Sequence, residues 1–374
     1  MSQSETGAAG AKSMLGAAAF IVVVAGLREA QGIIIPTLLA AFLAILCAPV
    51  VVFLTRRRVP TVAAVMLVVV LVMGVVAGIG TILGGSVNGF TEAIPRYQDR
   101  MDGLLTSTVA WLEAKGLQVT ALNLGEIADP GQLMGLIGKT LGGLMSALSN
   151  TFLVLLTLVF ILLEAAGFPA KLTAIAGGSD VAVGRYARMM GQVQQYLFIK
   201  TILSLATGIL VGVWLAILGV DFPVLWGLIA FLLNYVPNLG SIIAAIPAVL
   251  LALVQLGVGY AAAAAAGYLV VNVAIGNVIE PHLLGRRLGL STLVVFLSLV
   301  FWGWVWGPVG MLLSVPLTMI VKIMLENTQD LKWIAILLDS PAVVATTHAP
   351  GPPPSPPEVA SVDEEVPPPP PGTL

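Results

Sequence analysis

The sequence predicts an all-α polytopic membrane protein with about eight membrane segments, two of which are broken or re-entrant helical hairpins in an inverted repeat. Hydrophobic residues make up 58% of the 374 residues and charged residues only 10%, whereas a soluble domain carries roughly 25% charged residues. Apolar runs such as 32–54 and 59–83 approach or exceed the roughly 20 residues that a helix needs to cross the hydrocarbon core. Basic residues gather in short loops between these runs, where positive charge marks the cytoplasmic side.

The first 84 residues predict a polar cytoplasmic tail, 1–12, followed by the N-terminal membrane spans, 13–84. The run 13–27 has the shape of a signal peptide, but another apolar run follows at once, so we interpret it as a retained span. With the N-terminus inside, spans at 13–27, 32–54, 59–84 and 147–164 leave two basic clusters in the cytoplasm, as the positive-inside rule requires. These clusters are Arg56, Arg57 and Arg58, and then Lys171, Arg185, Arg188 and Lys200.

Residues 85–146 are predicted to form an extracytoplasmic amphipathic helical segment. Its apolar residues alternate in steps of three and four, which is a heptad seam; they are Val87, Phe90, Ile94, Tyr97, Met101, Leu104 and Trp111, with Thr108 at the one missing position. The seam fits either a helix lying on the membrane or self-association. Small residues such as Gly74 and Gly78 allow close helix packing and favour a homo-oligomer. Pro95 predicts a kink or a helix start inside the seam.

The apolar stretch 222–256 is too long for one membrane helix and is interrupted at 234–240. If it crossed the bilayer once, Arg286 and Arg287 would lie outside after the next span, 257–279. A helix–break–helix hairpin that enters and leaves on the outer side returns both arginines to the cytoplasm. The positive-inside rule therefore favours a re-entrant hairpin after the fifth span, 196–218.

The stretch 291–325 repeats this pattern, with an interruption at 306–310, and a second hairpin keeps Lys322 and Lys332 inside. The units 196–256 and 257–325 then have opposite orientations and form an inverted repeat within a transport core, 147–325. Proline and glycine mark the breaks and the returning arms: the predicted structural breaks are Pro237, Gly240, Pro247, Gly307, Pro308, Gly310 and Pro316.

Residues 326–374 are predicted to form a cytoplasmic segment that ends in a disordered tail with polyproline character. Both termini are therefore expected on the cytoplasmic side of a bacterial inner membrane.

Polar side chains at the first break are candidates for binding a small polar solute. A broken membrane helix exposes backbone groups, and such a break persists only where it lines a cavity or packs in protein. Asn234, Asn238 and Ser241 flank the break, and they could contact the solute or only satisfy the helix ends. Asn272 and Asn277 lie towards the cytoplasmic end of the next span and are predicted to contact solute as well.

Two carboxylates are candidates for ion coupling, Glu164 and Glu280, because ionisable groups inside membrane spans are costly and usually functional. Glu280 lies three residues after Asn277, so the two share a face of an α-helix; the alternative is that Glu280 pairs with Arg286 or Arg287. Glu164 ends the fourth span and could exchange protons. Alternatively, it could pair with Lys200, whose side chain could instead reach the membrane interface by snorkelling. Asp221 at the outer boundary is expected to cap the helix that follows.

Catalysis, metal binding and nucleic-acid binding find no support in the sequence. Cys47 is the single cysteine, and the two histidines, His282 and His348, have no ligand-spaced neighbours. The net charge of −2 and the scattered basic clusters exclude a nucleic-acid face. No Gly-rich phosphate loop and no catalytic triad is present. We therefore expect no enzyme activity and no cofactor, and transport driven by a proton or sodium gradient.

Five stretches carry a resemblance to a known family. They are DFPVLWG at 221–227, NYVPNLGSIIAAIP at 234–247, GNVIEP at 276–281, GRRLGLS at 285–291, and FWGW followed by GPVGMLLSVPL within 301–317. These motifs resemble those of the autoinducer-2 exporter (AI-2E) family over the last half of the membrane domain, and the pattern at 234–240 is similar to its autoinducer-exporting branch. The resemblance implies a homo-oligomeric exporter of small solutes, linked either to release of the quorum-sensing furanone autoinducer-2 or to sodium–proton exchange.

Our hypothesis is an exporter driven by the proton-motive force, in which the two hairpins enclose a small hydrophilic solute and move against an oligomeric scaffold of N-terminal spans. One alternative is a sodium–proton antiporter, which needs a carboxylate that binds sodium and protons in competition. The other is a membrane scaffold without transport activity.

Overall fold

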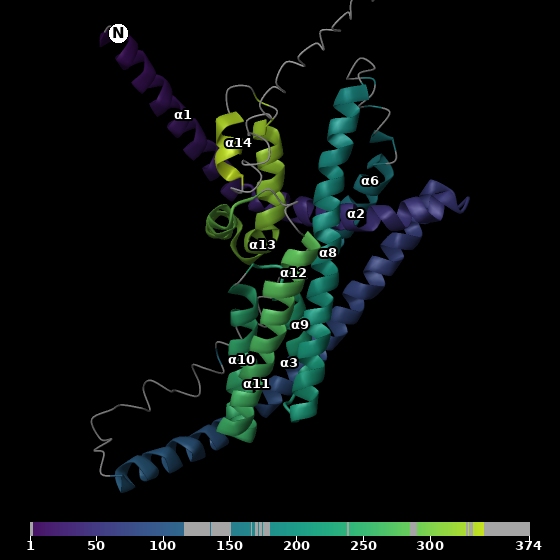
Figure 1. The fold of residues 1–374 in the computed structure, drawn as a ribbon. Helices are drawn as coiled ribbons and strands as arrows, with labels where there is room; N and C mark the ends of the chain where they lie inside the picture. Colours follow the sequence, from purple (N-terminus) through teal and green to yellow (C-terminus); the bar gives the residue numbers. More distant parts are fainter. Residues whose placement is uncertain are drawn as a thin grey trace, which may run out of the picture.

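The computed structural model describes residues 3–115, 151–165, 180–237, 239–284, 290–326 and 332–339, together with the single residues 135, 167, 168, 171, 174 and 328. Within these residues every regular element is a helix (Figure 1). The helices are α1 (Gln3–Glu29), α2 (Gln31–Arg56), α3 (Thr61–Ala114), α6 (Thr151–Ala165), α8 (Asp180–Leu218), α9 (Pro223–Leu233), α10 (Leu239–Leu256), α11 (Val258–Asn272), the π-helix η2 (Val273–Ile279), α12 (Glu280–Leu284), α13 (Thr292–Glu326) and α14 (Lys332–Leu338).

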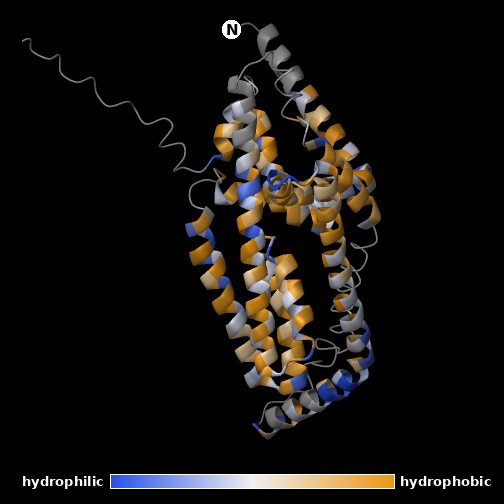
Figure 2. Cartoon of the chain, turned by 90° about the vertical axis from the view of Figure 1, so that its right-hand side faces the viewer, coloured by the Kyte–Doolittle hydropathy of each residue, from blue (hydrophilic) through white to orange (hydrophobic). Residues whose placement is uncertain are grey.

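Six helical stretches of the described residues are long and apolar enough to cross a membrane, and α6 and α9 are shorter apolar helices. The six stretches are Gln31–Arg56, Thr61–Gly103, Met190–Leu218, Leu239–Leu256, Val258–Leu283 and Thr292–Glu326. Hydrophobic residues, coloured orange in Figure 2, are frequent along these helices. An all-helical polytopic protein is therefore confirmed, whereas the number of eight segments and the re-entrant course of the hairpins stay predictions.

The N-terminal helices α2, α3 and α6 share one apolar core. Ala40 and Ala44 of α2, Ala64 and Val65 of α3 and Leu158 of α6 are all buried in it. Alanine at these positions lets the helix backbones approach closely, which is how membrane helices gain packing energy without a hydrophobic driving force.

Helix α3 runs without interruption for 54 residues and includes Pro95, so the alternative that a helix starts at this proline is wrong. The first part of the heptad seam packs within the same chain. Phe90 and Tyr97 are buried against the core of α9 and α10, and the ring of Phe90 lies 6.3 Å from that of Phe222. The side chains of Leu104, Thr108 and Trp111 lie outside the described residues, and the homo-oligomer stays a prediction.

Helices α8 to α11 pack side by side, and α2 crosses α8 (Figure 1). Helices α8 and α9 approach each other closely at Gly208 and Gly227. A Cβ atom on Gly208 would lie 2.6 Å from the carbonyl oxygen of Gly227, and the reverse substitution would meet the Gly208 carbonyl at the same distance. Glycine is therefore required at this crossing, because any side chain would push the two backbones apart.

Both predicted breaks are present. The first separates α9 from α10 at 234–238, and the second lies inside α13, where Trp306 and Gly307 leave helical geometry, Gly307 with a φ of 64°. Each break is followed by a glycine that touches the preceding turn. A Cβ atom on Gly240 would overlap the Leu233 carbonyl, and one on Gly310 would overlap the Trp302 carbonyl. The two breaks thus share a local geometry, as an inverted repeat requires, although the repeat itself stays a prediction.

Candidate functional site

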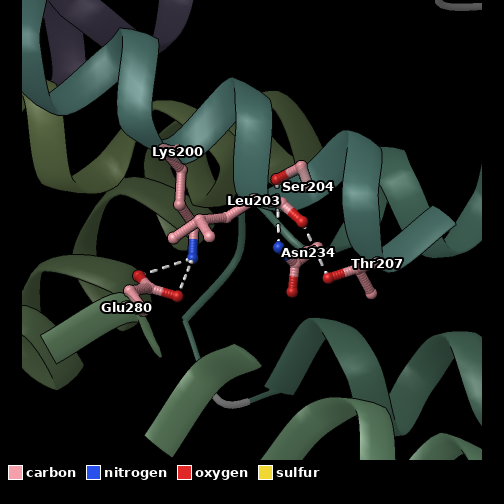
Figure 3. A network of polar contacts seen from close by, with 6 residues as sticks. All are labelled: Lys200, Leu203, Ser204, Thr207, Asn234 and Glu280. Carbon is pink, nitrogen blue, oxygen red and sulfur yellow. Dashed lines mark hydrogen bonds and ion pairs between the residues drawn. The ribbon is translucent and has the colours of Figure 1, made fainter. Parts of the chain in front are cut away.

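A buried ion pair lies beside the first break. Lys200 of α8 and Glu280 of α12 have side chains that are 3% and 20% exposed, and the lysine Nζ lies 2.7 Å from one carboxylate oxygen and 2.9 Å from the other (Figure 3). Removing two charges from water costs free energy, and their mutual attraction offsets this cost only when the geometry of the pair is good. An ionisable pair held between membrane-length helices is therefore a candidate functional site.

The pair continues into a polar stripe along α8. Lys200, Ser204 and Thr207 recur at helical spacing, and Ser204 and Thr207 are buried. The Ser204 hydroxyl accepts a 3.0 Å hydrogen bond from Nδ2 of Asn234, the first residue after α9 (Figure 3). Next to it, the Tyr235 hydroxyl donates a 2.7 Å bond to Oγ1 of Thr201. The stripe thus holds the start of the break against α8.

A π-helix leads directly into Glu280. Residues Val273–Ile279 form η2, and such wide turns occur frequently at functional sites. Asn277 within η2 is exposed, whereas Glu280 is mostly buried. The predicted common face of these two residues is therefore not found, because the wider turn of a π-helix places residues three apart further from each other than an α-helix does. No feature of the sequence marked this π-helix.

The second predicted coupling residue, Glu164, lies at the surface. Its side chain is 60% exposed and pairs with Lys171, which is 62% exposed. Surface pairs of this kind contribute little. Lys200 therefore neither reaches solvent nor pairs with Glu164, because its partner is Glu280. Arg286 and Arg287, the alternative partners predicted for Glu280, lie outside the described residues.

Two other predicted solute contacts, Ser241 and Asn272, line a separate groove between α10 and α11 with a volume of about 380 Å³. Tyr268, which the sequence did not single out, also lines it. The hydroxyls of Ser241 and Tyr268 are buried and find no hydrogen-bond partner among the described residues. Asn238 lies outside the described residues, so its predicted role stays a prediction.

Asp221 does not cap a helix, contrary to expectation. The N-cap of α9 is Phe222, with a φ of 59° and no side-chain cap bond. The Asp221 carboxylate instead accepts a 2.7 Å hydrogen bond from the Tyr97 hydroxyl, and its backbone N–H donates to Oε1 of Gln255. Asp221 therefore joins α3, α9 and α10.

Two tryptophans at the second break form hydrogen bonds to neighbouring residues. The indole N–H of Trp306 donates to the carbonyl oxygen of Leu27 at 3.0 Å, and that of Trp302 donates to Oγ1 of Thr318 at 3.1 Å. Near the C-terminal end of α13, Lys322 pairs with Asp339, which follows α14 directly. This second buried pair fastens α14 to the end of α13, away from either break, so we regard it as structural.

Membrane-length helices, a helix broken between them and a buried ion pair near the break are features typical of membrane transport proteins. The comparison with known families agrees with this class. The chain belongs to the AI-2E family of transporters, whose profile matches residues 17–330. It is thus a multi-pass membrane protein of a family that moves small solutes.

Curated relatives align over most of the chain. The AI-2 transport protein TqsA of Escherichia coli is 42% identical over 318 residues, which cover 85% of this chain and 92% of TqsA. A relative from Haemophilus influenzae is 39% identical over 333 residues, covering 87% and 96% of the two chains. YrrI of Bacillus subtilis is 25% identical over 323 residues, covering 78% and 86%.

Proposed function

We propose that this protein exports a small polar solute across the bacterial inner membrane, driven by an ion gradient, with the pair of Lys200 and Glu280 as its coupling element. The observation that carries the proposal is the position of this buried pair between the first break and the π-helix. The similarity to TqsA, named an AI-2 transport protein, supports autoinducer-2 as the solute.

The coupling step follows from the charges. When Glu280 is ionised, both of its oxygens bind Lys200 and hold α12 against α8. Protonation of Glu280 removes its charge and leaves the lysine charge poorly compensated at a buried position, which is strongly unfavourable. In the proposed mechanism the helices then rearrange so that Lys200 gains another partner. Proton binding at Glu280 thereby drives a movement between α8 and the η2–α12 segment.

Solute binding is assigned to the break itself. Asn234 presents an amide beside the ion pair, and its bond to Ser204 would exchange for a bond to the solute. Asn238, four residues later, is proposed to contact the solute as well. A movement at Glu280 therefore changes the site where solute binds, as ion-coupled export requires.

The test is gradient-driven efflux from proteoliposomes. Purified protein is reconstituted with autoinducer-2 inside, and efflux is followed after a pH gradient is imposed. We expect Glu280→Gln to abolish acceleration by the gradient while Glu164→Gln, a matched change at an exposed pair, leaves it intact. Equal acceleration in wild type and Glu280→Gln would reject the coupling role. Absence of efflux from wild-type vesicles would reject autoinducer-2 as the solute.

The same vesicles test the antiporter alternative. With a pH-sensitive dye inside and sodium added outside, a sodium–proton antiporter gives a dye response that Glu280→Gln removes. A response without any autoinducer-2 efflux would replace the export proposal by this alternative.

A further inference from the structure

We propose that the groove between α10 and α11 is a bilayer-facing binding site for a small uncharged amphiphile whose polar end carries a hydroxyl or carbonyl group. The groove is separate from the Lys200 and Glu280 pair, neither of which lines it. The inference therefore does not depend on the transport proposal.

The polar end of the site is built by two buried hydroxyls. Ser241 is 9% exposed and Tyr268 is 5% exposed, and neither hydroxyl has a partner among the described residues. A hydroxyl buried without a hydrogen bond is unfavourable and uncommon. Two other buried tyrosines of this chain, Tyr97 and Tyr235, each make a 2.7 Å bond through the hydroxyl. The walls of the groove thus contain two hydroxyls without a partner, and a ligand whose polar end inserts between α10 and α11 would supply one.

The residues that line the groove indicate the charge and the polarity of the rest of the ligand. Apart from Ser241, Tyr268 and Asn272, every lining residue is aliphatic: Ile242, Ala245, Ile246, Val249, Leu250, Ala265 and Leu269. None of the described residues that line the groove is charged, so a charged ligand would remain uncompensated in an apolar setting. Hydroxyl and amide groups can both donate and accept, which suits an alcohol or carbonyl group. An aliphatic body with one such group fits both parts.

The bilayer is the source of the ligand. Three lining residues on membrane-length helices are exposed to a large extent: Ile242 by 56%, Ile246 by 46% and Leu269 by 63%. A molecule dissolved in lipid reaches the groove sideways without crossing the protein. Its polar end then lies between Ser241, in the first turn of α10 after the break, and Asn272, which immediately precedes η2. A ligand bound in the groove would therefore contact both α10, next to the first break, and α11, next to the π-helix η2.

The test uses the full-length protein in detergent and the photoreactive alcohol 3-azioctanol. After illumination, adducts are mapped by mass spectrometry of proteolytic peptides. We expect adducts on the walls of the groove that an excess of 1-octanol suppresses and an excess of octane does not. The Ser241→Ala/Tyr268→Phe double variant should lower them by about fivefold or more, as loss of one or two hydrogen bonds predicts. Tyr260→Phe on the exposed part of α11 is the matched control and should change nothing.

Three results would overturn the proposal. One is the absence of groove adducts in wild type, which would also arise if a second copy of the chain filled the groove. Another is equal suppression by octane and 1-octanol, because the groove would then recognise only apolar surface. The third is equal labelling of the double variant and wild type. The competition in wild type decides the matter even if the double variant does not fold.

Discussion

Tyr97 and Asp221 are 124 positions apart, yet the tyrosine hydroxyl donates a 2.7 Å hydrogen bond to the aspartate carboxylate. The tyrosine is fully buried in the core shared by α3, α9 and α10. This bond fixes the long helix α3 to the start of the segment that contains the first break.

Tyr97→Phe should therefore weaken the fold by about 1–3 kcal/mol, because the hydrogen bond to a charged, partly buried carboxylate is lost while the apolar ring remains. The measurement is thermal unfolding of the purified protein in detergent. Tyr260→Phe, an exposed tyrosine on α11, serves as control and should leave the midpoint unchanged. Equal midpoints for Tyr97→Phe and wild type would show that the bond contributes nothing.

The ion pair makes a second prediction, for a double-mutant cycle. Lys200→Met and Glu280→Gln should each destabilise the protein by about 3–5 kcal/mol, because each leaves one buried charge without its partner. The double variant should regain most of this loss, since no charge then remains. It should still lack gradient-driven transport. If the two single effects simply added, the residues would not interact and the coupling proposal would fail.

The glycines after the breaks make a third prediction. Gly240→Ala and Gly310→Ala should each cost about 1–3 kcal/mol or more, since the added methyl group would overlap a backbone carbonyl that cannot move easily. Gly78→Ala is the matched control, because nothing lies within 4 Å of a Cβ atom there. Yield of folded protein from membranes and its unfolding temperature are the readouts. Normal values for Gly240→Ala would contradict the close contact with Leu233.

The indole of Trp306 allows a fourth prediction. Trp306→Phe keeps an aromatic ring but removes the bond to the Leu27 carbonyl, so α1 should separate more readily from α13, at a cost of about 1 kcal/mol. Limited proteolysis near residue 30 is the measurement, with faster cleavage expected in the variant. Trp333→Phe on α14, whose side chain is 60% exposed, is the comparison and should be cleaved at the wild-type rate.

The sequence predicted the helical class and both breaks because each has a local cause. Long apolar runs dictate membrane helices, and proline and glycine at 237–240 and 307–310 interrupt them. Gly240 and Gly310, which were predicted as break residues, lie just after the breaks, and the contact that requires glycine there became visible only in three dimensions.

Contacts between residues far apart in the chain could not be predicted from such local sequence patterns. Lys200 and Glu280 are 80 positions apart, and their contact depends on how α8 packs against α12. The alternatives drawn from the sequence were therefore pairing of Glu280 with the nearby arginines, and snorkelling of Lys200 or its pairing with Glu164; none of them included the observed pair. The polar stripe at 200, 204 and 207 was accessible from helical spacing alone. Tyr268 was not, because a single tyrosine in an apolar helix carries no pattern.

Helix α3 has one further consequence. At about 1.5 Å per residue its 54 residues extend for roughly 80 Å, well over twice the roughly 30 Å thickness of the hydrocarbon core. A large part of this single helix must therefore lie beyond the lipid tails as a stiff arm, with Pro95 as its one internal proline. Phe90 and Tyr97 fasten the arm to the residues just before α9. A small change in the tilt of α3 at this point would therefore produce a larger displacement at the far end of the arm, where a spin label would measure it.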